Sequence, residues 1–178
     1  MLDRIASGID AAIDALGRAV SWLTLALVVL TFGVVVLRYA FDQGSIALQE
    51  LVLWLHGAVF LLGASYALRH DAHVRVDILY QRWSPRGRAL ADLFGTLVFL
   101  LPFCVLLVSI SADYVASSWA VREGSKDAGG LPGLFVVKTL IPLCGVLLGV
   151  QGTAVALRKL AVLRGASGAA PHGHPERL

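Results

Sequence analysis

A compact group of histidines and aspartates, HDAHVRVD at residues 70–77, is the first place where the sequence could support metal chemistry. His70, His73 and Asp77 are spaced by three and four residues, so a helix would place them on one face in a geometry that can bind zinc. Arginines interleave with them, however, and their positive charge opposes cation binding. We therefore expect a hydrogen-bonded turn there, with no metal, cofactor or catalytic residue.

Ionisable side chains within long apolar stretches are the other candidates, because a charge is costly to place in lipid. Glu50 lies about one turn into such a stretch, where a helix N-terminus favours a carboxylate, and it could pair with Arg38. We expect Glu50 to make a buried polar contact with another protein, whereas Lys138 can extend outward to water. His56 is the only histidine inside an apolar stretch, so a haem site with two histidine ligands is not expected.

The elements that position these residues follow from composition. The chain of 178 residues is 57% hydrophobic and only 15% charged, with a mean hydropathy of +0.76, which is far more apolar than a soluble domain. Crossing a bilayer takes about 20 residues in a helix, and four stretches are long enough. They are residues 20–37, 51–68, 93–112 and 139–157. The second stretch is extended to Ile46, with Ser45 as its N-cap, and the fourth to Leu134.

The N-terminal segment, residues 1–18, has apolar residues at three- and four-residue steps and aspartates opposite them. This pattern predicts an amphipathic helix in the membrane plane or against a partner, and the aspartates argue against a signal peptide. The predicted fold is therefore all-α, an integral membrane four-helix bundle with an N-terminal amphipathic interfacial helix. Its parts are residues 1–18, the four-helix domain 19–160 and a flexible tail 161–178.

Small residues offer close helix contacts at Gly63-x3-Ala67 and Gly145-x3-Gly149. The four stretches hold few polar side chains that could line a pore or an alternating-access cavity. The two cysteines, Cys104 and Cys144, lie in apolar stretches and lack the spacing of a metal site. We therefore expect them to be buried as small apolar residues. The chain therefore resembles a protein that packs against a partner rather than one that transports alone.

Orientation follows from the basic residues, which accumulate on the cytoplasmic side of membrane proteins. Eleven of the 15 lysines and arginines fall at the two ends of the chain and between the second and third stretches. We expect these regions, including both termini, to be cytoplasmic, and residues 38–45 and 113–133 to face outward. Because the arginines flank apolar runs, the net charge of +3 indicates membrane orientation and not nucleic-acid binding.

Several motifs in order resemble one known family. They are VVVLRYAF, ALQELVLWLHGAVFLLGASYALR, HDAHVRVDILY and GGLPGLFVVKTLIPLCGVLLGVQG. They are similar to the small permease subunit, of DctQ type, of tripartite ATP-independent periplasmic (TRAP) transporters. The resemblance covers about residues 20–158, and it includes the four-helix topology and the length of the chain.

This resemblance implies a multi-pass protein of the bacterial inner membrane that pairs with a large multi-span permease subunit. A periplasmic substrate-binding protein would deliver an organic acid, and the large subunit would hold the substrate and sodium sites and move as an elevator. The small subunit would brace the fixed scaffold. A structural or interface role is implied for residues on the family's recurring positions, which are Arg38, Glu50, Trp54, His73 and Asp77. The alternative is a free-standing tetraspan scaffold, or a small membrane enzyme that uses the His70–Asp77 cluster.

Overall fold

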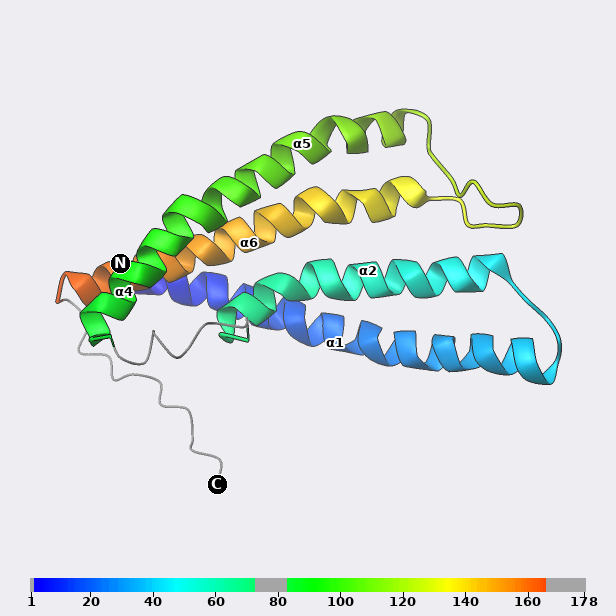
Figure 1. The fold of residues 1–178 in the computed structure, drawn as a ribbon, viewed down its shortest axis with the longest axis horizontal. Coiled ribbons are helices and arrows are strands. Elements are labelled where there is room, and N and C mark those ends of the chain that lie inside the picture. The colour runs from blue at the N-terminus through cyan, green and yellow to red at the C-terminus, as the bar shows by residue number, and fades with distance from the viewer. Residues whose placement is uncertain (1, 73–82, 166–178) are drawn as a thin grey trace, which may run out of the picture.

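The computed structural model describes residues 2–72 and 83–165, and these residues form long helices that run side by side (Figure 1). The helices are α1 (Leu2–Ala40), α2 (Ile46–Arg69), α4 (Pro85–Gly95), the π-helical turn η1 (Thr96–Leu100), α5 (Leu101–Ala120) and α6 (Leu134–Leu163). Within the described residues, α1, α2, the continuous run from α4 to α5, and α6 are each long and apolar enough to cross a membrane. The predicted all-α bundle with four membrane helices is therefore confirmed.

The helix ends are set by residues that satisfy free backbone groups. Ser45 caps α2 as predicted, since its Oγ accepts the N–H of Leu48 at 3.4 Å, and α6 begins at Leu134 as expected. Ser84 caps α4 in the same way and Pro85 follows, so the third membrane segment begins eight residues earlier than predicted, at Pro85 instead of residue 93. It also ends later, at Ala120, and the outward loop shortens from the expected 113–133 to 121–133.

The N-terminal segment forms one helix with the first membrane span. Residues 2–18 lie within α1, which has 39 residues and would therefore be about 58 Å long, roughly twice the thickness of a hydrocarbon core. The boundary expected at residue 18 is thus not a helix end. Ala6 and Ile13 are buried, so this part of α1 packs against the bundle. Its position at the membrane interface remains a prediction.

A single widened turn accommodates a proline in the third membrane segment. Pro102 has no N–H to donate to the preceding turn, and its ring would collide with a carbonyl there. The five residues of η1 come directly before it, and this π-helical turn joins α4 to α5 without a break. The segment therefore contains a proline while its helical continuity is kept.

Helix α6 is the core of the bundle, because a third of its most apolar window is buried against 6–11% in the other three segments. It packs on α5, α2, α1 and α4. Small residues allow the close contact with α5, as predicted: a Cβ on Gly145 would lie 3.2 Å from the carbonyl oxygen of Cys104, and one on Gly149 would lie 3.5 Å from its Cβ. Cys104 and Cys144 are both buried and unpaired, as expected of residues in apolar spans.

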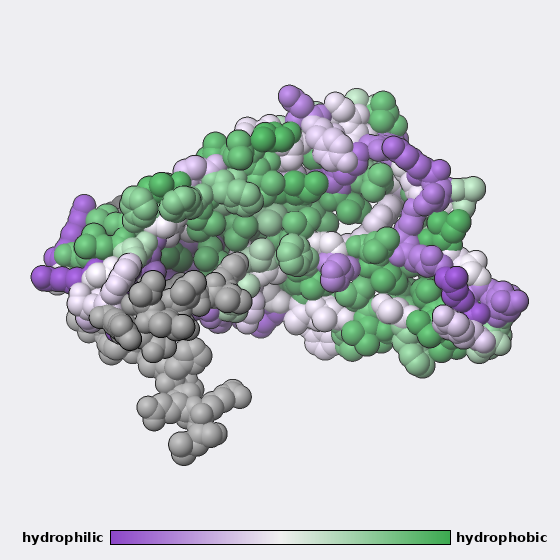
Figure 2. All heavy atoms as spheres, in the orientation of Figure 1, coloured by the Kyte–Doolittle hydropathy of each residue, from purple (hydrophilic) through white to green (hydrophobic). Residues whose placement is uncertain are grey.

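The bundle has two distinct ends. We call the end at which α1 begins and α6 finishes the terminus end, and the end with loops 41–45 and 121–133 the loop end (Figure 1). The visible surface between them is largely hydrophobic, and hydrophilic residues gather towards both ends (Figure 2). This distribution is that of a protein whose middle section is solvated by lipid.

Candidate functional sites at the two ends of the bundle

At the loop end, Glu50 binds the loop between α5 and α6. It lies near the start of α2, where its carboxylate accepts the hydroxyl of Ser125 and, at 2.7 Å, the backbone N–H of Leu131. A Cβ on Gly130 would lie 2.8 Å from Glu50 Oε2, so the loop backbone passes very close to the carboxylate. The contact expected with another protein is therefore made instead with a loop of the same chain, and Glu50 is half-buried there.

An ion pair holds the same loop from α6. Lys138 Nζ lies 2.5 Å from Glu123 Oε2 and 4.0 Å from the centre of the Tyr114 ring. Ser118 also donates a hydrogen bond to Glu123, at 2.8 Å. The hydrogen bond from Lys138, followed by that from Ser118, lowers the pKa of Glu123 below its ordinary value, so this carboxyl stays ionised. Lys138 thus has a defined partner and does not simply extend to water.

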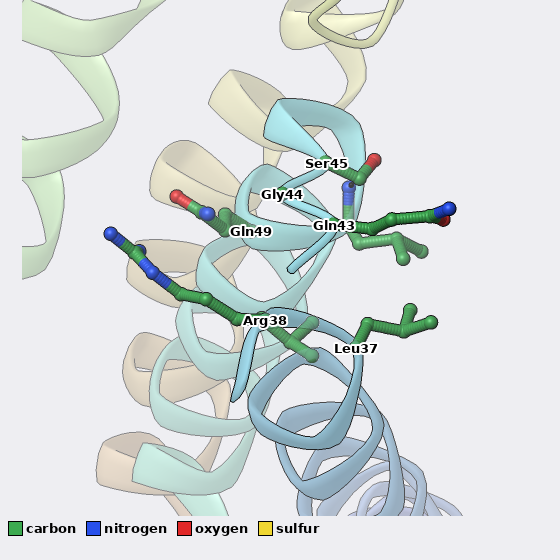
Figure 3. A pocket seen from close by; sticks show the side chains of 8 residues that line it. Leu37, Arg38, Gln43, Gly44, Ser45 and Gln49 are labelled. Carbon is green, nitrogen blue, oxygen red and sulfur yellow. Dashed lines mark hydrogen bonds between the residues drawn. The ribbon is translucent and has the colours of Figure 1, made fainter. Parts of the chain in front are cut away.

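The pairing of Arg38 with Glu50 is not formed. Arg38 is exposed and lines a shallow hollow at the α1–α2 loop, where its side chain and that of Gln49 extend to the same side (Figure 3). Glu50 accepts hydrogen bonds from the loop hydroxyl and N–H instead. Trp54, one turn after Glu50, is partly buried on α2. His73 and Asp77 lie outside the described residues.

At the terminus end, a network of charged groups joins three helices. Asp10 of α1 lies 2.8 Å from Arg69 of α2 and also binds Arg158 of α6. It accepts a hydrogen bond of 3.1 Å from Gln151, which is fully buried in α6. Asp14, one turn along α1, binds Arg69 at 2.5 Å. Asp10 therefore meets positive charge from two other helices at once.

Two further contacts extend this network. His70 Nε2 lies 3.0 Å from Asp14, and Lys159 of α6 lies 2.6 Å from Asp92 of α4. Sequence reasoning placed the aspartates on the polar face of an amphipathic helix but did not predict their partners. The available signal was the match between two aspartates one turn apart and basic residues at the ends of the second and fourth spans.

The chemistry of both clusters is structural. The carboxylates accept hydrogen bonds from arginine, lysine, hydroxyl and amide groups, so their oxygen atoms are engaged by donors of the protein itself. Among residues 2–72 and 83–165, the structure contains no group of three histidine, cysteine or acidic side chains that could hold a metal. The fold and the two clusters define a helical membrane protein whose polar groups hold its own helices and loops in place.

Comparison with known proteins agrees with this class. Residues 27–162, well over half of the chain, match the family described as "Tripartite ATP-independent periplasmic transporters, DctQ component". The chain belongs to this family, so it is a transporter component and not an enzyme. It is also 32% identical over 108 residues to a protein of Haemophilus influenzae whose name describes it as a TRAP transporter small permease protein. That match covers 61% of this chain and 65% of the relative, which is just under two thirds of the relative's length.

Proposed function

We propose that the chain is the small permease subunit of a sodium-coupled TRAP importer and that it braces a large elevator-type permease subunit. The family match supports the transporter role. The observation that carries the bracing role is the network at the terminus end, in which Asp10 connects α1, α2 and α6. A domain that moves needs a fixed scaffold to slide against. A bundle whose helices are joined by ion pairs as well as by apolar packing resists shear and so can serve as that scaffold.

The substrate in this proposal is an organic acid that a periplasmic binding protein delivers to the assembled permease. The small subunit itself has no substrate site in the proposal, in keeping with carboxylates that are already bound to protein groups. The cytoplasmic placement of both termini in a bacterial inner membrane, which follows from the distribution of lysine and arginine, belongs to the same proposal.

Reconstitution tests the bracing role. The large permease subunit is placed in liposomes with a sodium gradient and loaded binding protein, with and without this chain. We expect uptake only when the chain is present, while the binding protein keeps its affinity for the acid. Uptake at the full rate without the chain would contradict the proposal and leave an accessory role.

Orientation is tested by cysteine labelling in intact cells. Lys126→Cys lies in the loop 121–133 and Arg86→Cys lies near the start of α4, and both positions are exposed. An impermeant maleimide added from the periplasmic side should label the first variant and not the second. The native cysteines are buried and serve as an internal control, and labelling at position 86 alone would reverse the orientation.

A further inference from the structure

Helix α2 presents a face that no other part of residues 2–72 and 83–165 covers. Gln49, Leu53, His56 and Phe60 are all exposed, and their three- and four-residue spacing places them along one side of the helix. Gly63 continues this line, and a Cβ built there would meet no atom within 4 Å. We call these five residues the outward face of α2.

His56 is the residue on this face that lipid cannot satisfy. It is the eleventh of the 24 residues of α2, so it lies about 15 Å from the start of the helix, near the middle of a membrane span. Within the described chain it has no hydrogen-bond or charged partner. Imidazole carries a donor and an acceptor, and hydrocarbon offers neither. Ionisable residues at such depth normally face protein or a water-filled cavity, and this one is exposed on the described part of its chain.

Gly63 adds room for a close approach. It lies two turns beyond His56 on the same side, and its open surroundings would let the backbone of another helix pass near α2. By contrast, α5 fills the space beside Gly145 on α6, where Val108 lies only 2.8 Å from a Cβ built on the glycine. One glycine thus serves the internal packing of the bundle, and the other is left open on its surface.

We propose that the outward face of α2 is the docking site for a transmembrane helix of the large permease subunit. That helix places a hydrogen-bonding side chain opposite His56 and packs its backbone against Gly63. The proposal rests on the proposed function, because that function supplies the partner. A second copy of this chain fits less well: a two-fold interface sets His56 against itself, and one ring must then donate while the other accepts, so the copies cease to be equivalent.

Two glycine variants test the docking site. Gly63→Leu fills the outward face, whereas Gly33→Leu places the same bulk on α1, where a Cβ also meets nothing within 4 Å. Neither should disturb the fold of the isolated chain, which is checked by its thermal unfolding. The readout is the amount of large permease that co-purifies with the tagged chain at equal expression. We expect Gly63→Leu to lose about tenfold or more and Gly33→Leu to stay within about twofold.

Variants of His56 test its hydrogen bond separately. His56→Leu should weaken co-purification about threefold, the size of a typical interhelical hydrogen bond in a membrane, while His56→Gln retains a donor and an acceptor and should restore most of it. Equal retention of the permease by Gly63→Leu and Gly33→Leu would overturn the docking site but leave the function intact. Failure of the unaltered chain to co-purify would instead contradict the function. High-yield cross-linking of the His56→Cys variant to a second copy of the chain would show that this face binds another copy instead of the permease. That result would also overturn the proposal.

Discussion

The two ends of the bundle use carboxylates for different purposes. At the terminus end Asp10 joins helices, since it binds Arg69 of α2 and Arg158 of α6. At the loop end Glu50 and Glu123 hold the loop 121–133, and their partners include a backbone N–H and hydroxyl groups. The same chemical group therefore determines helix packing at one end and the shape of a connection at the other. Stability should depend mainly on the first end, and local loop order on the second.

The largest expected effect comes from Asp10→Asn. The side chain of Asp10 is only 14% exposed, and its partners Arg69, Arg158 and Gln151 are all hydrogen-bond donors. The new amide would turn an NH2 group towards those donors, so the chain should lose about 3 kcal/mol of stability, as expected when one partner of a buried ion pair is removed. Unfolding in mixed micelles measures it.

Asp113→Asn is the matched control for this variant. Asp113 is exposed on α5 and has no hydrogen-bond or charged partner among the described residues. Its replacement should leave unfolding within about 0.5 kcal/mol. Equal losses in the two variants would show that the network at the terminus end does not hold the helices together.

A second prediction concerns the close contact of α1 with α2 at the terminus end. A Cβ on Gly17 would lie 2.1 Å from the ring of Tyr66, which itself packs 4.3 Å from the His70 ring. Gly17→Ala should therefore cost about 1–3 kcal/mol, because Tyr66 has to move. Gly8→Ala, where a Cβ meets nothing, should be neutral or stabilise by up to about 1 kcal/mol through helix propensity. Similar unfolding of both variants would mean that the helices are less tightly packed there.

Glu50→Leu should affect the loop more than the whole bundle. It removes the acceptor of the Leu131 N–H and the Ser125 hydroxyl, a loss of about 1–3 kcal/mol in local stability. Hydrogen exchange of the Leu131 amide should accelerate by an order of magnitude or more, with the amides of α6 near Gln151 unchanged.

Glu50→Gln keeps one acceptor oxygen and should reduce transport only modestly, without altering its sodium dependence. A change in sodium stoichiometry would assign Glu50 a coupling role instead.

The smallest effect is the pH dependence of the loop end. Because its pKa is lowered in the folded protein, Glu123 contributes stability that is present above its unfolded pKa and is lost as the pH falls through the folded pKa. Carboxyl titration by NMR should give Glu123 a midpoint below the ordinary glutamate value. Lys138→Met removes the main cause and should raise that midpoint. An unchanged midpoint in this variant would show that Lys138 does not set the ionisation of Glu123.

The third membrane segment shows how far local sequence signals reach. Apolar length predicted its existence, but its ends lie at Pro85 and Ala120, beyond the uncharged stretch, because helix extends through polar residues once a cap is available. Ser45 illustrates the opposite case, in which a cap next to an apolar run was enough to predict the start of α2. Hydropathy thus locates spans well and helix ends less well.

The partners of the polar residues required the tertiary structure. Glu50 was expected to contact another protein, but its partners are Ser125 and Leu131 of the same chain, and their distance along the sequence concealed the contact. Asp10 and Asp14 looked like the solvated side of an amphipathic helix, because periodicity reports a face but not what covers that face. Likewise, the small-residue motifs that begin at Gly63 and Gly145 looked equivalent in the sequence. In the described structure Gly145 packs against α5, whereas a Cβ on Gly63 would meet no atom within 4 Å.

The sequence by itself determined that this is an integral membrane protein, that four of its segments can cross the bilayer, and which family its motifs resemble. These properties depend on local composition and on short motifs, and lipid solvation enforces helices wherever apolar runs are long enough. The tertiary structure decided that α1 is one continuous helix, that Asp10 joins α2 and α6, and that His56 faces outward. Those outcomes depend on how helices rotate and pack against each other, and that rotation is set by contacts between residues far apart in the chain.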